Sequence, residues 1–236
     1  MRRRGSIEKI SRGVIISGPF AGIRYADSDA VGISIPYILG TYELELGPVI
    51  ESLCQKPFDT IVNAGAGKGY YAVGFAIKNP LSRIIAFESD IRGRECIAKM
   101  ARLNAVADRV AVKGTCDTAL LADSVSGRGR CLVIMDVEGG EGVLLDPVVI
   151  PRLKECHILV ELHDFIFRGI AEVISARFQA SHDIAEIWSR PRTLDDFPVK
   201  TSLLTSLVLK RRFVGYMDER RPEKMRWFYL KPKGTG

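Results

Sequence analysis

The chain has 236 residues, of which 47% are hydrophobic and 26% charged, with 34 basic and 28 acidic side chains. This much apolar sequence with charges of both signs excludes a disordered chain and is typical of one folded domain with at most a small appendage. Apolar runs such as 131–135 fall far short of the roughly 20 residues that cross a bilayer, so we expect no membrane span.

The net charge of +6 is concentrated at one end of the chain. Nine basic and three acidic residues follow position 209, and the rest of the sequence is balanced. A basic segment of this kind is typical of a solvated surface or of a surface that binds a nucleic acid or another polyanion.

The cysteines and the first residues of the chain indicate the cellular compartment in which we expect the protein. The five cysteines are an odd number and include no CxxC pair, which disfavours a disulfide framework or a zinc site and predicts free thiols. The start, MRRRGSIEKISRG, is cationic but lacks the apolar stretch of a signal peptide. We therefore expect a cytoplasmic protein.

The first 58 residues differ from the rest. The sequence GVIISGPFAGIRY (13–25), with Gly18 and Pro19 as turn residues, predicts a β-hairpin. The stretch 42–53 predicts a helix leading into the first sheet strand. We expect residues 1–58 to form this N-terminal extension and residues 59–236 to form the main domain.

From Asp59 onward, short β-rich runs alternate with helical patterns, which predicts an α/β fold with a Rossmann-like, doubly wound sheet covered on both faces. The strands of five successive βα units are expected at 60–63, 83–88, 109–113, 131–136 and 158–163. The helices are expected at 70–78, 90–104, 117–124, 141–150 and 167–179.

The end of the chain breaks this alternation. Residues 184–188 and 226–231 predict two more strands, and the segment 189–225 between them is polar and basic, without the pattern of a compact helical crossover. We therefore expect seven strands, with the last one antiparallel as the return leg of a long hairpin.

The segment DTIVNAGAGKGYYAVGFA (59–76) predicts a strand, a loop with Gly65, Gly67 and Gly69, and then a helix. This is the architecture of a nucleotide-binding loop, because glycines allow a tight turn and close approach of a ligand to the helix N-terminus. Glu88 ends the next strand, where a carboxylate can accept both ribose hydroxyls or can simply be solvated.

Two motifs that the sequence lacks limit which nucleotides this loop is expected to bind. A dinucleotide fingerprint needs glycine at position 70, which is Tyr70, and no GxxxxGK[ST] loop is present. A ligand with a ribose and a cationic centre but no phosphate fits a short glycine loop ringed by acids. S-adenosylmethionine is such a ligand, and an NAD-dependent oxidoreductase is an alternative that Tyr70 disfavours.

Further titratable residues follow the fourth and fifth strands. Asp136 ends the fourth strand, and Glu141 follows it, where an acid in the first turn of a helix has a structural explanation too. Glu161 and His163 share one face of the fifth strand by its period of two. Ligands bind at the carboxyl ends of such strands, so we expect these groups near the reaction zone.

Five segments together resemble one family: GTYELEL (40–46), IVNAGAGKGYY (61–71), IIAFESD (84–90), MDVEGGEGVLLD (135–146) and VELHD (160–164). Across residues 12–165 the chain is similar to the FkbM-like class I methyltransferases, which depend on S-adenosylmethionine, and DVEGxE is the most specific element. The resemblance implies O-methylation of a hydroxyl on a saccharide, glycolipid or natural product. Asn63 departs from the acid that many class I enzymes carry there.

The resemblance also implies which residues bind the cofactor. Glu88 would bind the ribose, Asp117 would contact the adenine or simply cap a helix, and Tyr42 and Glu43 would close over the cofactor or pack as an ordinary helix face. The remaining cofactor-binding candidates are Asn63, Gly65, Gly67, Gly69 and Asp136.

Transfer to a hydroxyl also needs a base, and we expect His163 in this role, with Asp136 and Glu161 orienting it or the acceptor. No metal is required in this interpretation. The alternative is a divalent cation held by Asp136, Glu161 and Asp164, because hard cations prefer oxygen ligands.

A missing motif and the basic segment limit the chemical class of acceptor that we expect. No [DNS]PP[FYW] string, typical of enzymes that methylate base amines, follows the fourth strand. The basic residues of the segment 189–225 predict a cationic lid that selects an anionic small-molecule or glycan acceptor. Binding of RNA through the same segment is an alternative.

Overall fold

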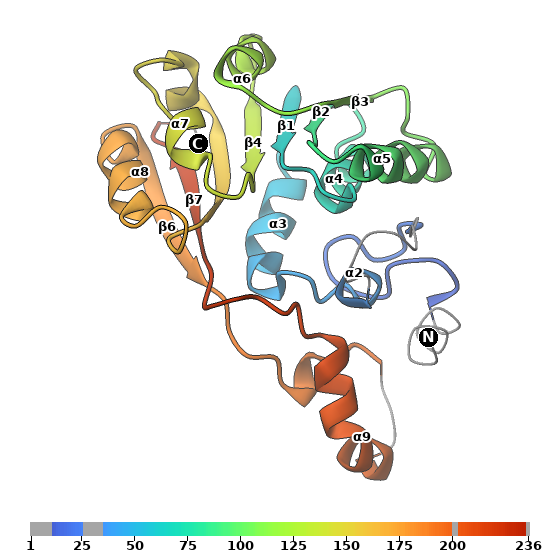
Figure 1. Ribbon diagram of the computed structural model, residues 1–236. Coiled ribbons are helices and arrows are strands. Elements are labelled where there is room, and N and C mark those ends of the chain that lie inside the picture. The colour runs from blue at the N-terminus through green and yellow to red at the C-terminus, as the bar shows by residue number, and fades with distance from the viewer. Residues whose placement is uncertain (1–10, 26–34, 200–202, 235–236) are drawn as a thin grey trace.

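In the computed structural model, residues 11–25, 35–199 and 203–234 are described, so most of the cationic start of the chain lies outside them. The protein is built on a seven-stranded sheet of order β3-β2-β1-β4-β5-β7-β6 (Figure 1). Its strands are β1 (Thr60–Ala64), β2 (Arg83–Phe87), β3 (Val110–Lys113), β4 (Cys131–Met135), β5 (His157–Leu162), β6 (His182–Trp188) and β7 (Arg226–Pro232). The predicted Rossmann-like α/β architecture is confirmed.

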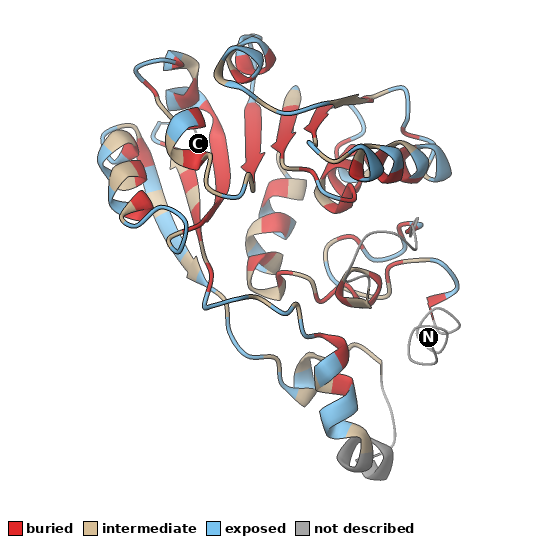
Figure 2. Cartoon of the chain, viewed as in Figure 1, coloured by how far each residue is buried: buried red, intermediate tan, exposed pale blue. Residues whose placement is uncertain are grey.

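The central strands are apolar on both faces, and each face has its own core (Figure 2). Ile61 and Ile84 belong to one hydrophobic core, whereas their neighbours Val62 and Ile85 belong to the other. Because successive strand residues point to opposite sides, continuous apolar runs require helices over both faces.

The helices divide between these two cores. On one side lie α3 (Gly47–Cys54), α4 (Tyr70–Lys78) and α5 (Ile91–Leu103), and on the other α6 (Thr118–Val125), α7 (Glu141–Leu144) and α8 (Ile170–Phe178). The helix predicted over 141–150 is too long, because Pro147 disfavours helical backbone just before it, and a 3₁₀ helix follows at Pro151–Glu155. None of the described helices has the length and apolar character needed to cross a membrane.

The last strand runs antiparallel, as predicted. β7 inserts between β5 and β6 and pairs antiparallel with both, so that Leu230 lies opposite Ile158 on one side and Ile184 on the other. The first five strands pair in parallel. Their carboxyl ends therefore meet along one edge.

The N-terminal segment differs from its predicted form. The chain reverses within 13–25, but only a single bridge joins Val14 and Arg24, because turns occupy the residues between and Ile16 donates its N–H to Ile38 in α2 (Ile35–Leu39). The helix expected over 42–53 begins only at Gly47, where a proline occupies the first turn, after a 3₁₀ turn at Leu44–Leu46.

The segment between β6 and β7 contains a helix that the sequence pattern did not predict. A 3₁₀ turn (Leu194–Asp196) is followed by α9 (Leu203–Tyr216), which extends away from the sheet in Figure 1. Phe213 of α9 stacks on Phe197, with ring centroids 4.3 Å apart. The element that α9 chiefly contacts is the 3₁₀ turn of its own segment. Its sequence therefore lacks the apolar pattern of a helix that covers the sheet.

We expect Leu230→Ala to lower the free energy of unfolding by about 2–5 kcal/mol, because Leu230 is fully buried in the middle of β7 and truncation leaves a cavity. Urea denaturation measures this. The matched control, Leu81→Ala, should change stability by less than about 0.5 kcal/mol, since Leu81 is 94% exposed. Equal effects of the two substitutions would contradict this assignment of the core.

Candidate active site

The glycine loop between β1 and α4 lies against the end of β4. Gly65, Gly67 and Gly69 have φ angles of 75°, 53° and 88°. A Cβ atom at position 65 would lie 1.5 Å from the carbonyl oxygen of Asp136, so no larger residue fits. At position 67 nothing lies within 4 Å, and only the left-handed backbone favours glycine.

Glu88 holds this loop from the end of β2. Its carboxylate accepts the backbone N–H of Gly67 at 2.6 Å and that of Asp90 at 2.8 Å. Gly93 makes room for the arrangement, because a Cβ there would lie 2.7 Å from the Glu88 Cγ atom. Sequence reasoning missed Gly93, although a glycine inside an amphipathic helix is a recognisable signal of close approach.

Two adjoining cavities open at the carboxyl edge of the sheet. The larger has a volume of about 600 Å³, and the smaller, of about 60 Å³, reaches Asn63, whose buried Oδ1 atom has no hydrogen-bond partner among the described residues. Between them they are lined by most of the residues predicted for the site: Tyr42, Glu43, Asn63, Gly65, Gly67, Glu88, Asp136, Glu161 and His163.

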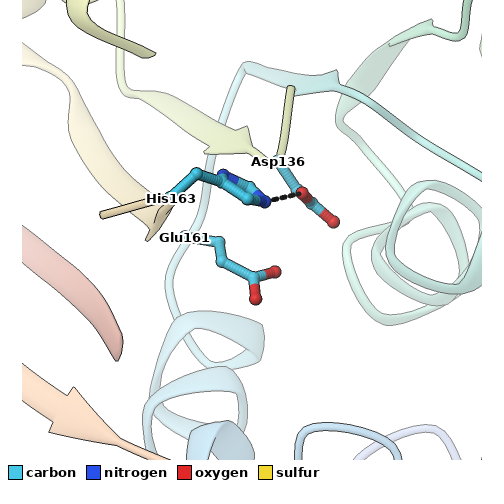
Figure 3. A group of neighbouring side chains, drawn as sticks. All are labelled: Asp136, Glu161 and His163. Carbon is cyan, nitrogen blue, oxygen red and sulfur yellow. Dashed lines mark ion pairs between the residues drawn. The ribbon is translucent and has the colours of Figure 1, made fainter. Parts of the chain in front are cut away.

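The two strand ends bring His163 and Asp136 together (Figure 3). The buried carboxylate of Glu141 lies 2.7 Å from His163 Nδ1, so this nitrogen carries the proton and donates it to Glu141. Nε2 lies 3.5 Å from an Asp136 oxygen and 3.4 Å from Glu138. When the ring is neutral, Nε2 is therefore the nitrogen that faces the cavity as an acceptor.

Acidic side chains outnumber basic ones around this cavity, and the pKa values of Asp136 and His163 are raised. Burial, together with the charges of Glu43 and Glu138, raises the pKa of Asp136 to about 8. Burial also lowers the pKa of His163, but the hydrogen bond and charge of Glu141 outweigh this effect, so the pKa of His163 lies above its usual value. The site is a centre of excess negative charge.

Arg221 is the main cation in this cluster, and sequence reasoning did not give it this role. It pairs with Glu161, its Nη2 atom lies 2.9 Å from Glu43, and its Nε atom lies 2.9 Å from Glu219. The guanidinium also lies over the ring of Trp227, 4.8 Å from its centroid. Arg221 is therefore a partly buried charge held by three carboxylates, rather than an exposed residue of a cationic lid.

Glu43 belongs to this ion-pair cluster and also lines the smaller cavity. Its carboxylate accepts the hydroxyl hydrogen of Tyr71, and its backbone N–H donates to Glu219 at 3.1 Å. Burial raises the pKa of Glu43 against the opposing effect of Arg221. Its neighbour Tyr42 lines both cavities.

Two acids predicted for the site are engaged elsewhere. Asp164 forms a two-pronged ion pair with Arg226, with both N–O distances 2.7 Å, and Asp117 caps α6 by accepting the N–H of Leu120 at 2.7 Å. The structure thus realises the helix-cap alternative for Asp117.

The residues that could bind a divalent cation differ from those predicted from the sequence. In the part of the chain that the structure describes, the atoms that can surround a divalent cation belong to Asp136, Glu161 and His163, and they lie within 4.8 Å of one another. His163 takes the place predicted for Asp164. Arg221 already provides Glu161 with a positive partner.

Neither a known family profile nor a curated protein matches the chain, so the resemblance to the FkbM-like family stays a prediction. Several solved structures of methyltransferases have a similar fold. Human methyltransferase 10 domain containing protein has a TM-score of 0.53 and 14% identity, covering 97% of this chain and 94% of that one. An O-methyltransferase from Bacillus cereus, solved in complex with SAH, has a TM-score of 0.51 and 10% identity, covering 98% and 91%.

Precorrin-6y C5,15-methyltransferase from Geobacter metallireducens has a TM-score of 0.52 at 10% identity, covering 88% of this chain and 92% of that one. At these identities the likeness concerns the fold. The chain therefore has the Rossmann-like, seven-stranded fold of these methyltransferases, including the antiparallel strand.

We expect Gly65→Ala to destabilise the protein far more than Gly67→Ala. Both positions have left-handed backbone, which costs an L-residue about 1–2 kcal/mol, but only position 65 adds a clash with β4. Chemical denaturation of the two variants under the same conditions measures the difference in their free energies of unfolding. If Gly65→Ala were as stable as Gly67→Ala, the close approach of the loop to Asp136 would be refuted.

Proposed function

We propose that this protein is an S-adenosylmethionine-dependent methyltransferase that methylates a hydroxyl of a saccharide, glycolipid or natural-product acceptor. The observation that carries the proposal is the meeting, around one cavity, of the glycine loop, Glu88 at the end of β2 and the pair Asp136 and His163 at the ends of β4 and β5. The methyltransferase fold of the chain supports it.

The residues present fit this cofactor. Position 67 leaves open space at the loop, Glu88 offers ribose-binding oxygens, and the unsatisfied Oδ1 of Asn63 offers an acceptor for an ammonium group. The Tyr70 side chain is buried where a pyrophosphate-binding loop needs glycine, which disfavours NAD. When bound, S-adenosylmethionine supplies an activated methyl group, so alignment contributes most of the catalysis, about 7–11 kcal/mol.

His163 is the proposed general base. Its Nδ1 proton is held by Glu141, which leaves Nε2 free to accept the proton of the acceptor hydroxyl. After that transfer the ring is cationic, and the Glu138 carboxylate, 3.4 Å from Nε2, stabilises it. Asp136, 3.5 Å from Nε2, adds to this effect when it is ionised. Such a base contributes about 10²–10⁴-fold in rate.

Glu161 has a supporting role in this proposal. Arg221 fixes its carboxylate at the wall of the cavity, and Asp136 extends from the neighbouring strand toward the same space. A divalent cation at Asp136, Glu161 and His163 is the competing arrangement, and it would occupy the nitrogen that the base mechanism needs. Full activity after exhaustive chelation would exclude it.

Glu88→Ala should weaken binding of S-adenosylhomocysteine by about 10–100-fold, because two hydrogen bonds to a charged group are lost. Asp117→Ala is the matched control. It should leave this affinity unchanged and cost about 1 kcal/mol of stability, because Asp117 caps α6 outside the cavities. Isothermal titration calorimetry and denaturation measure both effects. Absence of binding to the wild-type protein would reject the proposed cofactor.

His163→Ala should lower methyl transfer from labelled S-adenosylmethionine to a panel of hydroxyl-bearing saccharides by about 10²–10⁴-fold. The affinity for S-adenosylhomocysteine should change little. In the wild type, activity should rise with pH through a value above 6.5, because His163 must be neutral to accept a proton and its pKa is raised. An unchanged rate in the variant would remove His163 from the mechanism.

A further inference from the structure

A large groove lies beside the reaction cavity, between the segment that follows β6 and the α9 helix. Its volume is about 1250 Å³, roughly twice that of the reaction cavity. One wall contains residues 189–195, and the other contains the second half of α9 and the turn that leads to β7. No residue of the glycine loop lines this groove, and its lining shares Glu219, Arg220 and Arg221 with the reaction cavity.

The groove carries a surplus of positive charge. Seven basic and three acidic residues line it. Three of the arginines have structural partners: Arg190 pairs with Asp196, Arg192 with Glu45 and Glu219, and Arg221 with its carboxylate cluster. These three are therefore less available to a ligand.

The other basic residues are open to a ligand. Lys210, Arg211 and Arg220 are exposed, and none has an acidic side-chain partner within residues 11–25, 35–199 and 203–234. The Lys224 ammonium lies over the Trp188 ring, 4.6 Å from its centroid. An exposed cation without a partner binds an anion at little cost, because no existing ion pair has to break.

The groove is continuous with the reaction cavity. Glu219, Arg220 and Arg221 line both. The two spaces differ in charge, since the reaction cavity is rich in carboxylates and the groove is rich in cations. An elongated ligand with an anionic part would therefore place that part in the groove, while its uncharged hydroxyl end reaches His163.

The lining indicates the class of ligand. Among the described residues that line the groove there is no aromatic side chain, whereas sites for single-stranded nucleic acid generally stack bases on aromatic rings. Guanidinium and ammonium groups suit sulfate, phosphate or carboxylate groups on a polar chain. Resting on the proposed function, we propose that the groove binds the anionic part of the acceptor, and that the acceptor is a polyanionic saccharide.

The test measures binding to the full chain by fluorescence anisotropy with a labelled heparin hexasaccharide. Neutral maltohexaose serves as the uncharged probe and hexauridylate as the nucleic-acid probe. The hexasaccharide should bind, maltohexaose should not, and hexauridylate should bind more weakly. Lys210→Glu/Arg211→Glu should weaken hexasaccharide binding by at least about tenfold, because charge-assisted contacts are replaced by repulsion.

The matched control is Lys99→Glu/Arg102→Glu, which makes the same change of net charge on the exposed face of α5. It should retain most of the affinity. If both double variants weakened hexasaccharide binding equally, the effect would come from net charge alone, and the proposal would be overturned. Unchanged binding in the α9 variant, or tighter binding of hexauridylate than of the saccharide, would overturn it as well.

Titration with S-adenosylhomocysteine separates this proposal from the proposed function. Both double variants should bind that ligand as the wild type does, which also shows that they are folded. If the cofactor product binds but the hexasaccharide does not, the groove assignment fails and the methyltransferase proposal stands. If the cofactor product does not bind the wild type, the methyltransferase proposal fails, whatever the saccharide does.

Discussion

The carboxyl edge of the sheet depends on one partly buried guanidinium, which is held by carboxylates. Arg221 meets Glu43 from the N-terminal segment, Glu161 from β5 and Glu219 from its own loop, so three distant parts of the chain converge on one positive charge. Removing one partner of such a buried cluster typically costs about 3–5 kcal/mol, because the remaining charges lose their compensation. The wall of the reaction cavity therefore exists only while these segments are held together.

Burial and the charges of Glu43 and Glu138 raise the pKa of Asp136, and Glu141 raises the pKa of His163 against the effect of burial. The excess of acidic groups makes the cavity attractive to a cation and repellent to an anion. A cationic cofactor and a protonated imidazole are both favoured in this field. The adjoining basic groove has the opposite preference. The two adjoining spaces therefore differ in the sign of the charge that they favour.

The parts of the site that could be predicted from the sequence are those set by local geometry or by topology. The glycine loop and Glu88 follow from one βα unit, and Asp136 and His163 meet because parallel strands end at one edge. Arg221 could not be singled out, since it is one of nine basic residues after position 209 and its partner Glu43 lies 178 positions away. Ion pairs at such separations have no periodic pattern. The α9 helix has no pattern of a helix that covers the sheet, because the element it chiefly contacts is the 3₁₀ turn of its own segment.

The position of the inserted segment has an evolutionary consequence. β6 and β7 are neighbours in the sheet, with Trp188 opposite Arg226, so whatever joins them leaves and re-enters the core at one place. Closing a longer connection there adds only about 0.6 kcal/mol for each doubling of its length. Selection can therefore lengthen, shorten or replace the part of this connection between Arg192 and Glu219, while the ion pairs of Arg221 and the glycine loop stay intact. Proteins that descend from one ancestor can thus share the sheet and the glycine loop and differ in the surface that this connection forms.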